Sequence, residues 1–324
     1  MTSRSVSAFA GIVGSLLLAT TGGLSAQDFP RRPVTLVAPF PAGSITDGVA
    51  RMVAEHYTKA LGQSALVENK PGQEGAIAAR SVAQSAPDGY TVLAGGSTTH
   101  SAALALYKSL PYEPMKDFRA VGGVMKVPLL LCVRADFPAS DLAGYVRIAK
   151  ERSGQLSFGS GSTATRAAGE LLKARAAIDV LHVPYRGIPN ALTDLLGGRI
   201  DSAFIDPSNA LGMIEEGRIK VLGASSSQRL KRLPDVPTIA ESGYPGFEVV
   251  PWIGLFVPAR TPEPVYRRLA DELARFYDVP EARAFVDKVG VEMFAAGEEP
   301  LGQYLADDIK RWAEFVDVAK IERN

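Results

Sequence analysis

Two stretches of small and hydroxyl-bearing residues each follow a short apolar run and precede a helical pattern. The first reads VTLVAPFPAGSITD from Val34 to Asp47, and the second reads LSFGSGSTATRAAGE from Leu156 to Glu170. At such a strand-to-helix junction, backbone N–H groups at the positive end of the helix dipole point at whatever lies in front of them. Each stretch is therefore predicted to bind an anion. If the two junctions belong to different domains, they predict a cleft that closes on a small carboxylate.

Other residues near these patterns are candidates for the same cleft. Gly95 to His100 (GGSTTH) is a third strand-to-helix junction, and its Ser97 and Thr98 are predicted to form another wall. Arg166 follows the second junction within one helical turn, where a cation is unfavourable beside the helix dipole. A nearby anion or simple exposure to solvent would each account for it. Asp206 precedes Pro207 and is expected to cap the next helix rather than to contact a donor group of the ligand.

Competing chemistries fit these residues less well. Gly159, Gly161 and Ala164 spell G-x-G-x-x-A, a dinucleotide-binding pattern, but the chain from His182 to Arg186 lacks the expected acidic residue. Ser160 does not lie in a G-x-S-x-G motif, and no histidine is placed by sequence to serve it, which disfavours a hydrolase. The three histidines have no metal-ligand spacing. No cofactor, metal or catalytic residue is therefore expected.

The N-terminus has the features of an export signal. Arg4 precedes the apolar run Ala8 to Ala19, and the small residues Gly22 to Ala26 precede Gln27. The apolar run, at about 12 residues, is well short of the roughly 20 that span a bilayer, which favours a cleaved signal peptide over an anchor. Residues 1–26 are thus predicted to be removed, and a periplasmic location is expected.

Charge and cysteine content limit the possible partners. The chain has 35 basic and 35 acidic residues and no long basic block, so nucleic acid and anionic membranes are poor candidates. Its single cysteine, Cys132, lies in an apolar run and is predicted to be buried, without a disulfide partner.

The order of apolar patterns predicts the fold class. Short β-rich runs alternate with helical patterns, which is typical of α/β folds with mainly parallel sheets and flanking helices. The extended runs Arg119 to Arg134 and Phe247 to Pro258 are predicted to cross between two domains and to form a hinge with the ligand between them. The first domain would then be discontinuous, residues 27–124 and 250–324, and the second would comprise residues 125–249.

Several stretches carry a resemblance to a known family. They are APFPAGSITDGVARMVAE (38–55), VENKPGQEG (67–75), APDGYTVL (86–93), LYKSLPYEPMKDF (106–118), AGELLK (168–173), HVPYRGIPNALTDLLGGRID (182–201), RLPDVPTIAESGYPGFE (232–248) and WIGLFVPARTP (252–262). In unbroken order from about residue 29 onward, they resemble the Bug-type substrate-binding proteins of tripartite tricarboxylate transporters. The resemblance implies a monomeric, non-catalytic Venus-flytrap periplasmic binding protein that presents a small organic acid to membrane permease subunits. Two alternatives remain: a sensory binding protein that docks on a membrane receptor, and an exported enzyme that acts on a carboxylate.

The resemblance also implies where the ligand binds. In that family, backbone amides and hydroxyls of two loops hold the ligand carboxylate, partly through ordered water. The corresponding positions here are Phe40, Pro41, Ala42, Gly43, Ser44, Ile45, Thr46, Ser160, Gly161, Ser162, Thr163, Ala164 and Thr165. Ser44 and Ile45 interrupt what is usually a glycine run, so an Ile45 side chain facing the cleft would make it narrower or more apolar. Arg166 replaces the usual histidine, which suggests a second anionic group on the ligand.

Overall fold

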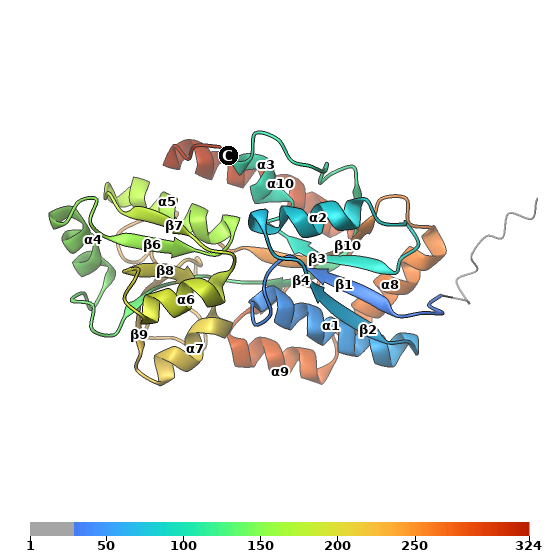
Figure 1. Ribbon diagram of the computed structural model, residues 1–324. Helices are drawn as coiled ribbons and strands as arrows, with labels where there is room; N and C mark the ends of the chain where they lie inside the picture. The colour runs from blue at the N-terminus through green and yellow to red at the C-terminus, as the bar shows by residue number, and fades with distance from the viewer. Residues whose placement is uncertain (1–28, 324) are drawn as a thin grey trace, which may run out of the picture.

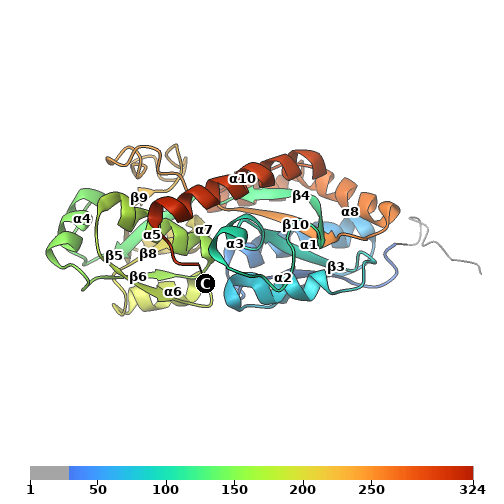
Figure 2. The same cartoon turned by 90° about the horizontal axis from the view of Figure 1, so that it is seen from above.

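The computed structural model describes residues 29–323, so the predicted signal peptide, residues 1–26, lies outside the described residues. The chain forms two β-sheets with helices packed around them, and the two parts lie end to end in an elongated molecule (Figures 1 and 2). We call the part built on the six-stranded sheet the first lobe and the part built on the five-stranded sheet the second lobe. No helix in residues 29–323 is both long and apolar enough to cross a membrane.

The first lobe contains a sheet of strand order β11-β4-β10-β3-β1-β2. Its strands are β1 (Val34–Ala38), β2 (Ala65–Asn69), β3 (Thr91–Gly96), β4 (Phe118–Lys126), β10 (Trp252–Pro258) and β11 (Glu292–Met293). Its helices are α1 (Ile45–Leu61), the 3-10 turn η2 (Gln73–Gly75), α2 (Ala76–Ala83), α3 (Ser101–Leu106), α8 (Glu263–Phe276), α9 (Pro280–Val289) and α10 (Glu298–Ala319). β1 pairs in parallel with β2 and β3, whereas β10 and β11 pair in antiparallel fashion.

The second lobe contains a sheet of strand order β7-β6-β8-β5-β9. Its strands are β5 (Leu130–Arg134), β6 (Ser157–Ser160), β7 (Leu181–Pro184), β8 (Ser202–Ile205) and β9 (Ile219–Ala224). Its helices are α4 (Leu142–Glu151), α5 (Thr163–Ala176), α6 (Ile188–Leu196) and α7 (Pro207–Glu215). β6 pairs in parallel with β7 and β8, and β5 pairs in antiparallel fashion with β8 and β9. Cys132 is buried in β5 as a free thiol.

The two-domain α/β fold predicted from the sequence is confirmed, but the sheets are mixed rather than mainly parallel. The parallel strands belong to β-α-β units, in which a helix brings the chain back so that the next strand starts at the same end of the sheet. Two strands next to the crossings, β10 in the first lobe and β5 in the second, run against these units, and β4 and β9 pair with them in antiparallel fashion. The antiparallel pairs therefore arise where the chain passes between the lobes.

The two crossings are hydrogen-bonded to each other and to Ser225, the residue that follows β9. Val127 N donates to Pro251 O at 2.7 Å. Leu129 N donates to Ser225 Oγ at 2.9 Å, and that hydroxyl donates to Val249 O at 2.5 Å. Because Ser225 is fully buried, these bonds define one compact connection between the lobes.

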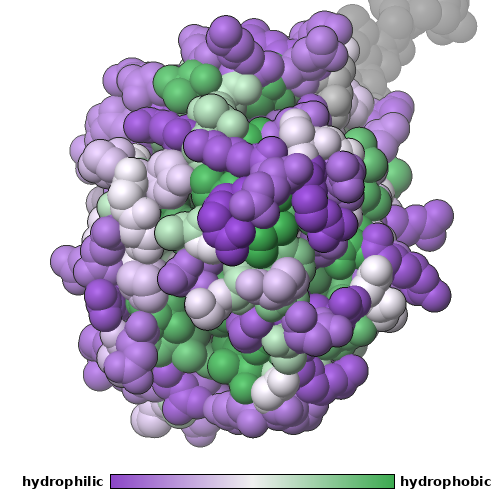
Figure 3. All heavy atoms as spheres, turned by 90° about the vertical axis from the view of Figure 1, so that its left-hand side faces the viewer, coloured by the Kyte–Doolittle hydropathy of each residue, from purple (hydrophilic) through white to green (hydrophobic). Residues whose placement is uncertain are grey.

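The last helix, α10, provides a third link between the lobes. It runs along both of them in Figure 2. Its Leu301 and Leu305 belong to a core cluster of the first lobe, whereas Trp312 and Val316 pack in the core of the second lobe. The two halves of α10 thus pack in the cores of different lobes. Seen from the end formed by the second lobe, most of the surface is hydrophilic (Figure 3).

Candidate functional site

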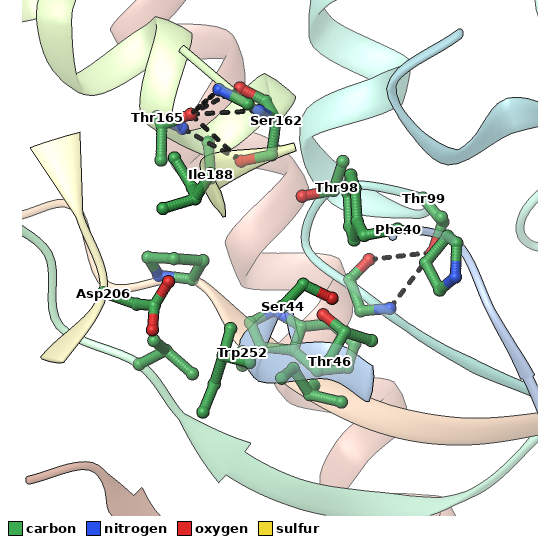
Figure 4. A pocket seen from close by; sticks show the side chains of 18 of the residues that line it. Phe40, Ser44, Thr46, Thr98, Thr99, Ser162, Thr165, Ile188, Asp206 and Trp252 are labelled. Carbon is green, nitrogen blue, oxygen red and sulfur yellow. Dashed lines mark hydrogen bonds between the residues drawn. The ribbon is translucent and has the colours of Figure 1, made fainter. Parts of the chain in front are cut away.

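A cavity lies between the two lobes, in front of the strand-to-helix junctions (Figure 4). The first lobe contributes Pro39, Phe40, Ser44, Ile45, Thr46, Ala94, Gly95, Gly96, Thr98, Thr99, Trp252 and Ile253. The second lobe contributes Gly161, Ser162, Ala164, Thr165, Ile188 and Asp206, and the crossings contribute Val127, Leu129 and Pro251. The lining is mainly apolar, with hydroxyl groups at the helix starts.

The first junction leaves two helix amides available. Ser44 is the N-cap of α1, and its hydroxyl accepts from Asp47 N at 3.3 Å. The amide of Ser44 itself donates to Pro41 O at 3.2 Å. Among the described residues, no acceptor pairs with the amides of Ile45 and Thr46 at the first two positions of α1. These N–H groups lie at the positive end of a 17-residue helix and can bind an anion.

Asp47 holds the loop of the first junction in place. Its Oδ2 accepts from Gly43 N at 3.0 Å, and its Oδ1 accepts from Asn69 Nδ2 at 2.9 Å. Arg51 pairs with the same carboxylate at 3.0 Å. Burial opposes ionisation of Asp47, but the hydrogen bonds from Arg51, Gly43 and Asn69 outweigh it and lower the pKa. Asp47 is thus held ionised within the loop, where it binds Gly43, Asn69 and Arg51.

The second junction has the same arrangement on the other side of the cavity. Ser162 is the N-cap of α5, and it forms a capping box in which Thr165 Oγ1 accepts from the amides of Gly161 and Ser162 at 3.1 and 3.0 Å. For the amides of Thr163 and Ala164, the described part of the chain provides no acceptor. Ala164 lines the cavity, so its amide is the counterpart of those of Ile45 and Thr46.

Thr163 is covered by a side chain from the first lobe. Its Oγ1 donates to Glu74 Oε2 at 2.8 Å, and Tyr107 OH donates to the same oxygen at 3.1 Å. Glu74 lies in a run of positive backbone angles, with φ of 135° at Gly72, 45° at Gln73, 49° at Glu74 and 95° at Gly75. Such angles are costly for non-glycine residues, and strained segments often accompany functional contacts. Glu74 thereby joins the two lobes beside the cavity.

Of the two hydroxyl residues predicted to form a wall at the third junction, Thr98 lines the cavity and Ser97 does not. Ser97 is buried and accepts from Trp252 N at 2.9 Å, so it fixes β10 instead of facing the cavity. Thr98 lines the cavity, and its hydroxyl points into it (Figure 4). His100 is fully buried and stacks on Phe256, and burial lowers its pKa to about 3. His100 is therefore a neutral packing residue.

Trp252 is fixed in the cavity wall by Asp308 of α10. Asp308 Oδ2 accepts from Trp252 Nε1 at 2.8 Å, from Ser101 Oγ at 2.5 Å and from Trp312 Nε1 at 3.1 Å. All four side chains are buried. Since the donors come from α3, β10 and α10, this group ties the third junction to the helix that spans both lobes.

Asp206 occupies the second-lobe side of the cavity and caps α7. Its carboxylate accepts from Asn209 N at 3.2 Å, and also from Asn209 Nδ2 and Ser208 Oγ. It is 2% exposed and lines the cavity (Figure 4). Burial raises its pKa, although these hydrogen bonds oppose the shift. Both roles considered for Asp206, the helix cap and a position facing the ligand, are therefore compatible with the structure.

Some predicted site residues do not reach this cavity. Ala42, Gly43, Ser97, Ser160, Thr163 and Arg166 are not part of its described lining. The Arg166 guanidinium instead donates to Glu322 O at 3.2 Å. Ser160 Oγ lies 2.7 Å from His182 Nε2, so a histidine does accompany this serine, unlike the expectation from the sequence. Ser160 is only 1% exposed, and burial and the nearby Arg166 lower the pKa of His182.

The cavity residues that come from the crossings and from β10 were not predicted from the sequence. These are Val127, Leu129, Pro251, Trp252 and Ile253. They could have been predicted, because segments that cross between two domains must pass behind the cleft that the domains enclose. No sequence pattern marks Ile188 of α6 as a cavity residue. Ile45 does line the cavity, which makes that wall apolar. Residues 29–323 contain no group of three or more His, Cys, Asp or Glu side chains that could hold a metal ion.

Known proteins match this chain over most of its length. The family model described as "Tripartite tricarboxylate transporter family receptor" matches residues 49–321. The structure of the periplasmic binding protein BugD is similar with a TM-score of 0.88 and 34% identity, covering 91% of this chain and 100% of that one.

Two further solved structures contain organic acids. An R. palustris protein with adipate has a TM-score of 0.88 and 30% identity, covering 91% of this chain and 99% of that one. MatC from Rhodopseudomonas palustris with bound malate has a TM-score of 0.84 and 35% identity, covering 89% and 100%.

Proposed function

The chain belongs to the tripartite tricarboxylate transporter receptor family, and from that premise we propose that it captures a small organic carboxylate between its lobes. The observation that carries this proposal is that two helices, one from each lobe, begin at one cavity with amides that have no acceptor among the described residues. A carboxylate has two oxygens, so it can accept from both helix starts at once. Each charge-assisted hydrogen bond contributes about 1.5 to 3 kcal/mol, so a few of them suffice for micromolar binding.

Bound to both lobes, a carboxylate would stabilise the closed arrangement. The proposed moving parts are residues 27–124 with 250–324 and residues 125–249, which turn about the two crossings. Since the second half of α10 packs on the second lobe, closure must also change that contact. The open and closed forms must differ by only a few kcal/mol for a ligand to shift their populations. The relatives' location implies that the chain works in the periplasm, and we propose that residues 1–26 are removed on export and that membrane permease subunits receive the ligand.

A melting-temperature screen over short organic acids tests this function. A ligand that binds only the folded protein stabilises it by about 2.7 kcal/mol at a concentration 100-fold above its Kd. At least one acid is expected to raise the melting temperature, and its neutral carboxamide is expected to have no effect. The proposal would be contradicted if no acid raised the melting temperature, or if acid and carboxamide acted equally.

Glu74→Asn is expected to weaken binding of an acid found in that screen about 5- to 30-fold. Asparagine tolerates the left-handed backbone at this position but is too short to repeat the contact with Thr163. The buried Thr163 hydroxyl then lacks its acceptor in the closed form, which costs about 1–2 kcal/mol. Isothermal titration measures the change, with the exposed Glu68→Gln as control. Equal affinities of the two variants would show that Glu74 does not support closure.

A further inference from the structure

We propose that the cavity selects acids with one carboxylate and an apolar body, and that Asp206 excludes dicarboxylates. This inference rests on the proposed function, because it concerns which carboxylates the same cavity accepts. It assigns Asp206 a role in specificity in addition to its role as the cap of α7.

The cavity offers an anion backbone amides and hydroxyl groups, but no cation. The amides of Ile45, Thr46 and Ala164 have no acceptor among residues 29–323, and neither have those of Thr98 and Ile188, which also line the cavity. In Figure 4, Ser44, Thr46 and Thr98 are grouped on one side, and Asp206 lies on the opposite side. A ligand carboxylate at the helix starts therefore directs the rest of the molecule toward Asp206.

The walls between these two sides are apolar. They are formed by Val127, Leu129, Ile188, Pro251, Trp252 and Ile253. Within residues 29–323, no lysine or arginine lines the cavity. A second carboxylate would lose its hydration here without gaining a cation, whereas a hydrocarbon chain would gain free energy from the burial of its apolar surface.

The nearest cation on α5 cannot compensate for this. Arg166 is directed to the carbonyl of Glu322 and is not part of the cavity lining. Glu74 adds another carboxylate beside the start of α5, through its contact with Thr163. Among the described residues that line the cavity, Asp206 is the one with a charged side chain.

Asp206 makes this side unfavourable for an anion. Its side chain is 2% exposed, and its acceptor positions are directed to Asn209 and Ser208, without an ion pair among the described residues. Its pKa is already raised by burial, so a second anion nearby would add like-charge repulsion or force Asp206 to take up a proton. Specificity by such repulsion is a common device in binding sites.

Hexanoate and adipate provide a matched pair of probes, because they share a six-carbon chain and differ in one terminal carboxylate. Isothermal titration of the full-length mature protein is expected to give at least about tenfold tighter binding of hexanoate, since one unpaired buried charge costs 1.4 kcal/mol or more. Asp206→Asn is expected to reduce that ratio at least about threefold. Asparagine is a good N-cap, so α7 is retained. The exposed Asp136→Asn, in the same lobe, is the matched control and should leave the ratio unchanged.

The outcomes separate this inference from the proposed function. Tighter binding of adipate than of hexanoate would overturn the inference while supporting carboxylate capture. A ratio unchanged by Asp206→Asn, in a variant with the circular dichroism spectrum of the parent, would overturn the role of Asp206. If neither acid and no other carboxylate bound, both the inference and the proposed function would be wrong.

Discussion

Ile45→Pro is expected to weaken carboxylate binding about 10- to 100-fold while α1 remains folded. Ile45 is the first residue of α1, a position that accepts proline because its N–H has no partner within the helix. The preceding Ser44 has φ of −70° and ψ of 156°, the extended conformation that a residue before proline requires. The substitution removes one amide donor, and a hydrogen bond to a charged group is worth about 1.5–3 kcal/mol.

The control for this variant is Ile45→Ala, which shortens the side chain but keeps the N–H group. Isothermal titration with an acid from the thermal screen compares the two variants. Both lose the apolar contacts of Ile45 with the first-lobe core, so only the difference between them reports on the amide. Equal affinities of the proline and alanine variants would show that the α1 amide does not bind the ligand.

Asp308→Ala is expected to destabilise the protein by about 3–5 kcal/mol, one of the larger effects that a single substitution can have. It removes the acceptor shared by Trp252, Ser101 and Trp312, all of them buried. Each buried donor left without a partner costs about 1–3 kcal/mol. The melting temperature should fall by roughly 5–10 °C. Ligand affinity should fall as well, because Trp252 forms part of the cavity wall.

Asp307→Ala is the matched control for this experiment, since its side chain is 53% exposed and pairs only with groups on the surface of α10. Thermal or urea unfolding of both variants gives the comparison. A loss of less than about 1 kcal/mol for Asp308→Ala would mean that the buried donors find other partners, because that is the least that one unpaired buried donor costs.

The parts of the fold that depend on neighbouring residues could be predicted from the sequence. Helix α1 begins after the N-cap Ser44 and ends at Gly62, which has φ of 70°, and both residue types are common at these positions. Helix α6 likewise lies between two glycines, Gly187 and Gly197. Helix caps, glycine ends and apolar periodicity depend on residues close together in the sequence, so they can be predicted from one segment alone.

The contacts that bring distant segments together could not be predicted in this way. Glu74 and Thr163 are 89 residues apart, and Asp308 and Trp252 are 56 apart. Whether Arg166 faces the cavity or the C-terminal segment depends on how α10 packs against α5, which no local pattern contains. The junctions could therefore be found from residue types, but the partners of their side chains required the tertiary structure.

A crystal structure of the protein with a bound acid from the thermal screen tests the central claim most directly. We expect one carboxylate whose oxygens lie about 3 Å from the amide nitrogens of Ile45 or Thr46 in the first lobe and of Ala164 in the second. A carboxylate bound elsewhere, for example in the polar groove lined by Lys126 and Arg311, would contradict the claim that both helix starts bind the ligand. A carboxylate in the cavity that contacts the amides of neither helix start would contradict it equally.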